Sequence, residues 1–263
     1  MTGGGVANAQ FGIADVGLVS QAEVVEQARR VCATVELPVV VDADTGYGNA
    51  MNVMRTVAEL ERAGVAAIQL EDQVTPKRCG HFAGKEVIPI AEMVAKIHAA
   101  RDARYDPGLV LIARTDALQG LGVDEAIARG RAYRDAGADV IFVEAPQTIH
   151  DLRRIPREIP GVPHVVNVVE GGVTPVLTRH EYEEMGFRVI LHANLALRAA
   201  VFAVQGALEH LLRAGDSAAL RDRILDWSAR QDLVHLGEVR AIEARYATDG
   251  ATRSDRVREP SRE

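Results

Sequence analysis

Residues 39–48 read Val39-Val40-Val41-Asp42-Ala43-Asp44-Thr45-Gly46-Tyr47-Gly48, an apolar, β-branched run followed by two acidic residues and then by glycines. The apolar part is typical of a buried strand, and the glycines permit a tight turn. Because alternate side chains of a strand point to the same side, Asp42 and Asp44 are expected on one face. The stretch predicts a buried strand that brings two carboxylates to one place.

Similar apolar runs recur along the chain, with helical patterns between them. Strands are expected at Val39–Asp44, Ala67–Asp72, Leu109–Asp116, Val140–Ala145, His164–Val169 and Arg188–Ala193. Helices are expected at about Gln21–Thr34, with Ser20 as N-cap and Glu23 completing a capping box, and at Val53–Ala63, Ile90–Ala103, Asp124–Ala136 and Thr178–Met185. Because strands alternate with helices, the sheet is predicted to be parallel.

Most of these strands end in charged or polar residues, which would converge if the sheet closed into a barrel. An open doubly wound sheet is less favoured, because no Gly-rich phosphate fingerprint follows the first strand. We therefore predict an α/β fold of the (β/α)8 TIM-barrel type. Only six of the eight strands are visible, and Thr2-Gly3-Gly4-Gly5 is interpreted as a loop whose preceding strand is missing. The barrel is thus expected to lack its first strand–helix unit.

The length of 263 residues and the 48% of hydrophobic residues suit one domain over residues 1–247, followed by a mobile charged tail at 248–263. The net charge is −7 and no stretch clusters Lys and Arg, so nucleic acid is not expected as a partner. The apolar strand runs are too short to span a membrane, and no signal peptide is evident. With two cysteines, a reducing, cytoplasmic location is predicted. Cys32 is expected to be a small buried hydrophobe.

The acidic strand ends suggest a site for a hard cation. Asp42 and Asp44, with Glu71 at the end of the next strand, supply the oxygen ligands that Mg²⁺ prefers. The alternative is that these acids cap a turn or a helix.

A second candidate is the cationic segment Lys77-Arg78-Cys79-Gly80-His81. Basic neighbours should lower the pKa of the Cys79 thiol and make it an acid–base group or a nucleophile. A solvated basic turn with an incidental cysteine is the alternative.

A third candidate is Arg114, whose guanidinium could hold a substrate carboxylate through paired hydrogen bonds. It could equally form an ion pair with Glu144 or Asp116. Asn167 and Glu170 suit hydrogen bonding to an anionic ligand, although either could cap a helix. A structural role is expected for His192 and Asn194, which end the last strand.

Together these motifs resemble the isocitrate lyase/phosphoenolpyruvate mutase superfamily, and within it the short lyases acting on 2-methylisocitrate or 2,3-dimethylmalate and the carboxyvinyl-carboxyphosphonate phosphorylmutase-like proteins. The resemblance extends from Thr2 to about Tyr246. It rests on the order of Asp42-Ala43-Asp44-Thr45-Gly46-Tyr47-Gly48-Asn49, Leu70-Glu71-Asp72-Gln73, Lys77-Arg78-Cys79-Gly80-His81, Ala113-Arg114-Thr115-Asp116 and Asn167-Val168-Val169-Glu170-Gly171-Gly172.

The resemblance implies a role for each motif. Mg²⁺, with Mn²⁺ as the alternative ion, would be held directly or through water by Asp42 and Asp44, with Asp15 and Glu71 in the outer coordination. Thr2, Gly3 and Gly4 would surround one carboxylate of the substrate, and Arg114 would bind the same α-oxyacid part. The pocket would be completed by Glu144, Asn167 and Glu170. Cys79 would be the catalytic proton donor, supported by His81.

The implied activity is Mg²⁺-dependent cleavage of a 2-hydroxy di- or tricarboxylate to a 2-oxoacid and a carboxylic acid. The alternatives are a phosphonomutase or other phosphonate enzyme, an oxaloacetate decarboxylase, and an inactive oxyacid-binding relative. Phosphonate-handling members generally lack the Cys-Gly-His loop, which favours a lyase. Relatives also carry a further strand–helix unit and a tyrosine before the Thr-Gly-Gly loop, so either the sequence starts late or the barrel is incomplete. The resemblance further implies a homotetramer with exchanged C-terminal helices, for which the helical pattern at Ala218–Tyr246 is a candidate; the alternative is a helix packed on its own barrel.

Overall fold

A computed structural model of the protein describes residues 1–78, 80 and 84–247. Six strands form one parallel sheet in chain order. They are β1 (Val40–Asp42), β2 (Ala67–Glu71), β3 (Val110–Thr115), β4 (Val140–Val143), β5 (His164–Asn167) and β6 (Phe187–Leu191). All six predicted strands are confirmed, most of them a residue or two shorter than expected.

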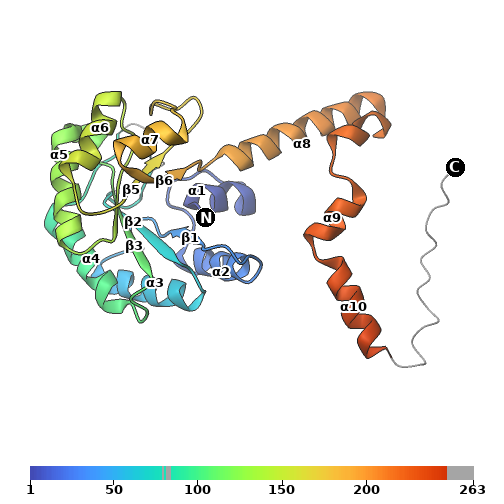
Figure 1. Ribbon diagram of the computed structural model, residues 1–263, viewed down its shortest axis with the longest axis horizontal. Coiled ribbons are helices and arrows are strands. Elements are labelled where there is room, and N and C mark those ends of the chain that lie inside the picture. The colour runs from blue at the N-terminus through green and yellow to red at the C-terminus, as the bar shows by residue number, and fades with distance from the viewer. Residues whose placement is uncertain (79, 81–83, 248–263) are drawn as a thin grey trace. The chain divides into compact units, whose positions relative to one another are not determined.

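Helices surround the curled sheet on its outer side (Figure 1). They are α2 (Gln21–Cys32), α3 (Ala50–Arg62), α4 (Ile90–Ala103), α5 (Leu118–Asp135), α6 (Ile149–Glu158) and α7 (Arg179–Met185). The capping box predicted for α2 is present, with the Ser20 hydroxyl accepting from the Glu23 amide and the Glu23 carboxylate accepting from Ser20. The sequence pattern did not predict α6.

The sheet is a half-barrel, with β1 and β6 as its edges in the described part of the chain. Met1 pairs with the outer edge of β1, donating to the Val40 carbonyl at 2.5 Å and accepting from the Asp42 amide at 3.0 Å. Closure into eight strands is not seen in the ranges given above, and it remains a prediction.

The two faces of the sheet have different roles. Outward residues such as Val41, Ile68 and Leu111 pack against the helices in the large core cluster. Inward residues such as Ile112 and Phe142 form a smaller apolar cluster under the open end of the sheet. Since side chains alternate along each strand, the inward set also decides which polar residues meet at the carboxyl ends.

The N-terminal segment differs from the loop that was expected. Gly3–Val6 form helix α1, followed by a π-helical turn at Ala7–Phe11. The Thr2 hydroxyl accepts a hydrogen bond from the Gly5 amide at 2.9 Å and so caps the helix. Capping and packing outweigh the low helix propensity of glycine.

The chain divides into two compact units, Met1–Ala199 and the residues from Ala200 on, where the sequence predicts one domain. Helix α8 (Leu195–Ala214) contains the boundary. The expected long helix at Ala218–Tyr246 is wrong, because the segment forms three pieces: a 3-10 turn at Ala218–Arg223, α9 (Trp227–Leu233) and α10 (Leu236–Tyr246). Asp226 starts a new helix by accepting from the amides of the residues that follow it.

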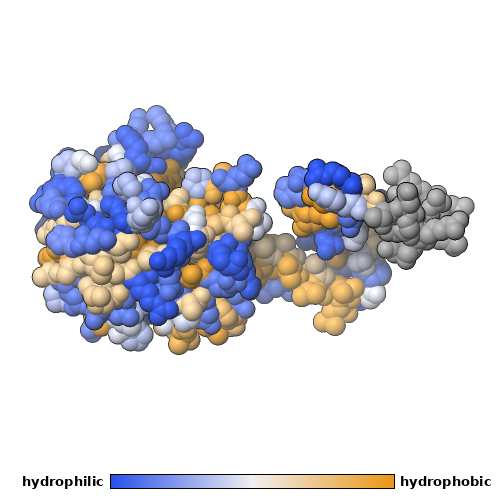
Figure 2. Space-filling view, turned by 90° about the horizontal axis from the view of Figure 1, so that it is seen from below, coloured by the Kyte–Doolittle hydropathy of each residue, from blue (hydrophilic) through white to orange (hydrophobic). Residues whose placement is uncertain are grey.

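Helix α8 is long and apolar enough to cross a membrane by length and composition, and it is the one such helix in the described residues. None of its residues is buried. Apolar side chains gather on the surface of the second unit (Figure 2). An exposed apolar surface of this kind is typical of a site covered by another protein or by lipid.

Candidate active site

Strand alternation delivers five polar side chains to the inner face of the half-barrel. Each stands two places beyond an inward apolar residue, and all but Gln69 lie within one residue of the carboxyl end of their strand. They are Asp42, Gln69, Arg114, Glu144 and Asn167, from β1 to β5 in order. The carboxyl ends of parallel strands are where such folds place their active sites.

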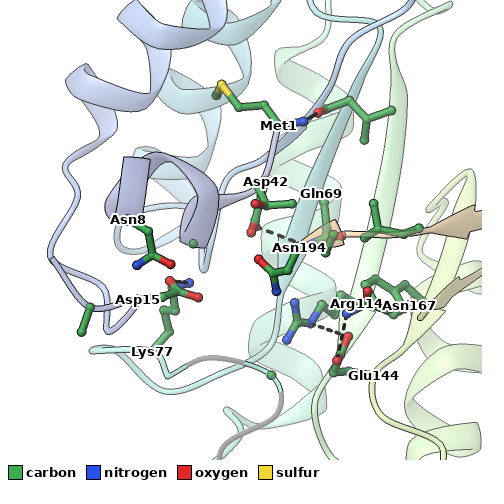
Figure 3. Close-up of a pocket in the computed structure, with 18 residues that line it drawn as sticks. Met1, Asn8, Asp15, Asp42, Gln69, Lys77, Arg114, Glu144, Asn167 and Asn194 are labelled. Atoms are coloured by element: carbon green, nitrogen blue, oxygen red, sulfur yellow. Dashed lines mark hydrogen bonds and ion pairs between the residues drawn. The ribbon is translucent and has the colours of Figure 1, made fainter. Parts of the chain in front are cut away.

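These residues line a cavity of about 300 Å³ (Figure 3). Its other lining residues are Met1, Thr2, Gly4, Asn8, Ala14, Asp15, Val40, Lys77, Gly80, Phe142, Leu191, Ala193 and Asn194. Figure 3 shows Asp15, Asp42 and Lys77 on one side of the cavity. Arg114, Glu144 and Asn167 lie on the other side. The cavity therefore has an acidic wall and a wall built around a guanidinium.

Asp42 organises the acidic wall. One of its oxygens accepts from the Gly3 amide at 3.1 Å, and the other accepts from the Asp44 amide at 3.1 Å and from Gln69 at 3.2 Å. These bonds join α1, β1 and β2 at one carboxylate.

Lys77 neutralises part of this wall. Its ammonium donates to Asp15 at 2.5 Å and lies 3.0 Å from Asp44 Oδ1. Burial and the charge of Asp42 raise the pKa of Asp44 to about 7, against the effect of Lys77. Burial lowers the pKa of Lys77, but the carboxylates around it outweigh burial and raise it overall. Three carboxylates thus share one ammonium.

The acidic wall fits a hydrated divalent cation. Within residues 1–78, 80 and 84–247, no three His, Cys, Asp or Glu side chains are arranged to bind a metal together. The prediction needs no such group of three, because it places Asp15 and Glu71 in the outer coordination only. Mg²⁺ binds through one or two carboxylates and keeps several waters, so Asp42 and Asp44 suffice as ligands. The excess of carboxylates over ammonium groups supplies the charge that such an ion would balance.

Helix α1 lies directly against these aspartates. A Cβ atom added at Gly3 would stand 3.0 Å from an oxygen of Asp44, and one added at Gly4 would stand 3.0 Å from an oxygen of Asp15. The glycines predicted to surround a substrate carboxylate therefore allow close backbone approach to the acidic wall. Thr2, assigned to the same carboxylate, lines the cavity, and its hydroxyl also caps α1.

Arg114 is engaged by more than one partner. Its Nε and one terminal nitrogen each donate to Asp116 at 2.9 Å. The other terminal nitrogen lies 3.4 Å from Glu71, and the guanidinium lies over the Phe142 ring at 5.3 Å. The expected alternative, an ion pair with Asp116, is therefore present. Arg114 still lines the cavity, with one terminal nitrogen outside the Asp116 pair.

Glu71 lies behind Arg114, is 1% exposed and does not line the cavity. Burial raises the pKa of Glu71 well above its ordinary value, more than the nearby Arg114 lowers it. One of its oxygens makes no hydrogen bond to the described residues. Its place in the outer coordination of a metal stays a prediction.

Glu144 and Asn167 complete the guanidinium wall. Asn167 donates to Glu144 at 3.3 Å, and Glu144 lies 3.8 Å from Arg114. The structure does not bring Glu170 to the cavity. Glu170 instead faces Arg198 at 3.6 Å and His192 at 3.8 Å.

The roles predicted for Cys79 and His81 concern residues outside the described part of the chain. Gly80, between them, is described and lines the cavity.

Several cavity residues were not predicted from the sequence. Gln69 could have been found, because it shares the inward face of β2 with Glu71. Lys77 was noted only as one of the basic neighbours of Cys79. Asn194, for which a structural role was expected, lines the cavity, as do Asn8 and Phe142.

Comparison with known proteins identifies the family. The family model described as phosphoenolpyruvate phosphomutase matches residues 1–212. The chain belongs to this family. The match includes every strand of the half-barrel and every described residue that lines the cavity.

Two relatives of this family member are named lyases. The 2,3-dimethylmalate lyase of Eubacterium barkeri is 44% identical over 94% of this chain and 86% of its own length. A probable 2-methylisocitrate lyase of Corynebacterium glutamicum is 43% identical over 88% of this chain and 76% of its own length. The family member is accordingly an enzyme of the isocitrate lyase/phosphoenolpyruvate mutase type.

Solved structures agree with this assignment. A 2,3-dimethylmalate lyase superposes with a TM-score of 0.88 at 38% identity, covering 97% of this chain and 85% of that one. An oxaloacetate acetylhydrolase gives 0.87 at 33% identity, covering 93% and 83%. A phosphonopyruvate hydrolase complexed with oxalate and Mg²⁺ gives 0.81 at 34% identity, covering 93% and 86%. The family fold therefore carries several reactions of short oxyacids.

Proposed function

We propose that this protein is a Mg²⁺-dependent carbon–carbon lyase that splits a 2-hydroxy di- or tricarboxylate of the 2,3-dimethylmalate or 2-methylisocitrate type. The products would be a 2-oxoacid and a second carboxylic acid. The observation that carries the proposal is the cavity in which Asp42 and its acidic neighbours face Arg114 and Asn167. Identity of 44% with a 2,3-dimethylmalate lyase supports this substrate class.

The two walls have complementary tasks. Arg114 and the Asn167 amide bind and orient the α-oxyacid end of the substrate through charge-assisted hydrogen bonds. Cleavage removes the proton of the substrate hydroxyl and breaks the adjacent C–C bond, and negative charge then collects on the departing carboxylate. A cavity carboxylate that does not hold the ion, such as Asp15 or Glu144, receives the hydroxyl proton.

Asp42 and Asp44 would hold Mg²⁺, and Mn²⁺ is the alternative ion. When bound, the ion stabilises negative charge on substrate oxygens as a Lewis acid. Lys77 shares this task by keeping a positive charge next to the same carboxylates.

The new carbanion carbon needs a proton, and we assign the donor to Cys79, supported by His81. The motif places a thiol among basic residues, which brings a thiol pKa toward neutrality and so suits proton donation. A phosphonomutase, which moves the phosphoryl group from carbon to the enolate oxygen, would have no use for this step.

A substrate panel tests the proposal. The purified protein with Mg²⁺ would be given 2,3-dimethylmalate, 2-methylisocitrate, isocitrate, oxaloacetate and phosphonopyruvate, and both products would be quantified by NMR. We expect equimolar 2-oxoacid and carboxylic acid from one of the first three compounds. Exclusive turnover of oxaloacetate or phosphonopyruvate would replace the lyase by a hydrolase, decarboxylase or mutase. Oxalate binding without any turnover would indicate an inactive relative.

We further propose that the protein acts in the cytoplasm as a homotetramer, with the apolar surface of the second unit covered by neighbouring subunits. The exposed residues on it include Phe202, Leu212 and Trp227, which are 79%, 88% and 70% exposed. Light scattering coupled to size exclusion would give four times the monomer mass of 28.4 kDa. A monomer that partitions into lipid vesicles would contradict this proposal.

A further inference from the structure

Lys85 joins two parts of the site wall and was not among the predicted site residues. Its ammonium lies 2.7 Å from Asp116 Oδ1 and also donates to the Gly80 carbonyl. The Lys85 side chain is 2% exposed and that of Asp116 is fully buried. A buried charge is costly unless it is paired, so this ammonium is held where both acceptors can reach it.

Asp116 is a rigid anchor for Lys85. Its carboxylate receives two hydrogen bonds from Arg114, and its amide donates to Asp72 at 2.9 Å. Burial alone would raise the pKa of Asp116. The ion pairs with Arg114 and Lys85 outweigh burial and hold this pKa below its ordinary value. Asp116 thus stays charged between two cations.

Gly80 lies directly on the guanidinium wall. A Cβ atom at this position would stand 2.3 Å from a terminal nitrogen of Arg114 and 2.9 Å from the carboxyl carbon of Glu144. No side chain fits there, so the backbone itself contacts the wall. Lys85 holds this backbone by its carbonyl.

We propose that Lys85 is a positioning residue that fixes the Gly80 peptide against Arg114 and Glu144. Cys79 precedes Gly80 in the sequence. The consequence for catalysis rests on the proposed function, in which Cys79 donates the proton.

The hydrogen bonds separate this role from substrate binding. Arg114 keeps both bonds to Asp116 without Lys85, so its hold on an oxyacid should survive the loss of the ammonium. The anchor of Gly80 would be lost. Removal of Lys85 should therefore impair the proton-transfer step more than binding.

Lys85→Met removes the ammonium and keeps most of the side-chain volume. With Mg²⁺ present, we expect kcat to fall at least 30-fold, while KM and the Kd of oxalate measured by calorimetry change less than threefold. Arg104→Met is the matched control, because Arg104 also bridges a carbonyl and a carboxylate, those of Leu109 and Asp139, away from the cavity. Its kcat should equal that of the wild type.

Two results would overturn the proposal: a kcat within threefold of the wild type, or a loss of kcat that matches the loss of oxalate-binding sites. The second result would mean that Lys85 only supports the fold. If Lys85→Met does not fold, Lys85→Leu, which also has no donor for the Gly80 carbonyl, is measured in the same way.

A second readout does not depend on the lyase reaction. The iodoacetamide alkylation rate of Cys79, followed by peptide mass spectrometry with Cys32 as internal reference, should rise at least fivefold in Lys85→Met. An unchanged ratio of the two rates would refute the positioning role even if no substrate were turned over. A changed ratio without turnover of any substrate by the wild type would refute only the proposed function.

Discussion

The ammonium of Lys77 lies 3.0 Å from Oδ1 of Asp44, on the wall where Asp42 and Asp15 add two further carboxylates. The Asp44 carboxyl, with a pKa raised to about 7, is therefore an acid that titrates near neutrality in the metal-free protein. A bound cation would favour its charged form, so metal affinity and pH should be linked at this residue.

The first prediction concerns stability and pH without metal. A carboxyl whose pKa is about 7 when folded and near 4 when unfolded binds its proton more tightly in the folded state. The contribution of this proton to the free energy of unfolding is fully present below pH 4 and is lost as the pH rises to 7. Asp44→Asn removes the titration. The free energy of unfolding of each metal-free protein is measured in urea at pH 5 and at pH 8. The difference between the variant and the wild type should shift by roughly 2 kcal/mol in favour of the variant from pH 5 to pH 8. Equal pH dependence of the two proteins would contradict the assignment.

The second prediction concerns Arg114. Lysine cannot donate two parallel bonds to Asp116 and still offer a further N–H to the cavity. Arg114→Lys should lower kcat/KM at least 100-fold and weaken oxalate binding in calorimetry. Arg154→Lys alters a comparable ion-pair set on the surface, with Glu158 and Asp124, and should leave kcat/KM unchanged. Comparable activity of the two variants would exclude Arg114 from substrate binding.

The third prediction concerns the thiols. Cys79→Ser should abolish cleavage, because a serine hydroxyl is a much weaker acid, while Mg²⁺ and oxalate binding measured by calorimetry remain intact. Cys32→Ser changes the other cysteine, on α2, and should retain activity. Full turnover by Cys79→Ser would remove this residue from the mechanism.

The fourth prediction concerns Gly80. A methyl group at this position meets Arg114 and Glu144 at less than van der Waals distance, so Gly80→Ala should lower kcat/KM more than tenfold. Gly120→Ala is the control, since its nearest neighbour would be 3.8 Å away and alanine favours a helix. Steady-state kinetics would distinguish the two variants. Full activity of Gly80→Ala would show that the side chains of Arg114 and Glu144 move to accommodate the methyl group without loss of function.

The fifth prediction concerns the buried support behind the site. One Asp72 oxygen accepts hydrogen bonds from Tyr133, Thr115 and Arg129, at 2.7, 2.7 and 3.1 Å. Tyr133→Phe deletes one donor and should lower the free energy of unfolding by about 1–2 kcal/mol. Tyr105→Phe, at a side chain that is 95% exposed, should change it by less than about 0.5 kcal/mol. Equal values for the two variants in urea unfolding would argue against this network.

Sequence alone predicted the strands and the carboxylates of the wall, because β-branched runs and alternation are local signals. It did not predict that Thr2 caps a helix, because Gly3, Gly4 and Gly5 have low helix propensity, and it left open whether Arg114 holds a substrate or pairs with Asp116 or Glu144. Glu170 follows the same strand as Asn167, yet it lies outside the cavity because the chain has left the alternating part of β5. Lys85 was not predicted as a site residue, because its ion pair joins it to Asp116, which is 31 positions away, and leaves no periodic pattern in the sequence.

Every strand of the half-barrel pairs with the strands next to it in the chain. The strand with which each new βα unit pairs has therefore already been synthesised when that unit leaves the ribosome. The sheet can form in the order of synthesis, because no strand pairs with a distant later segment. The acidic wall, built mainly from β1 and β2 and the loops beside them, would then be in place before the guanidinium wall is translated.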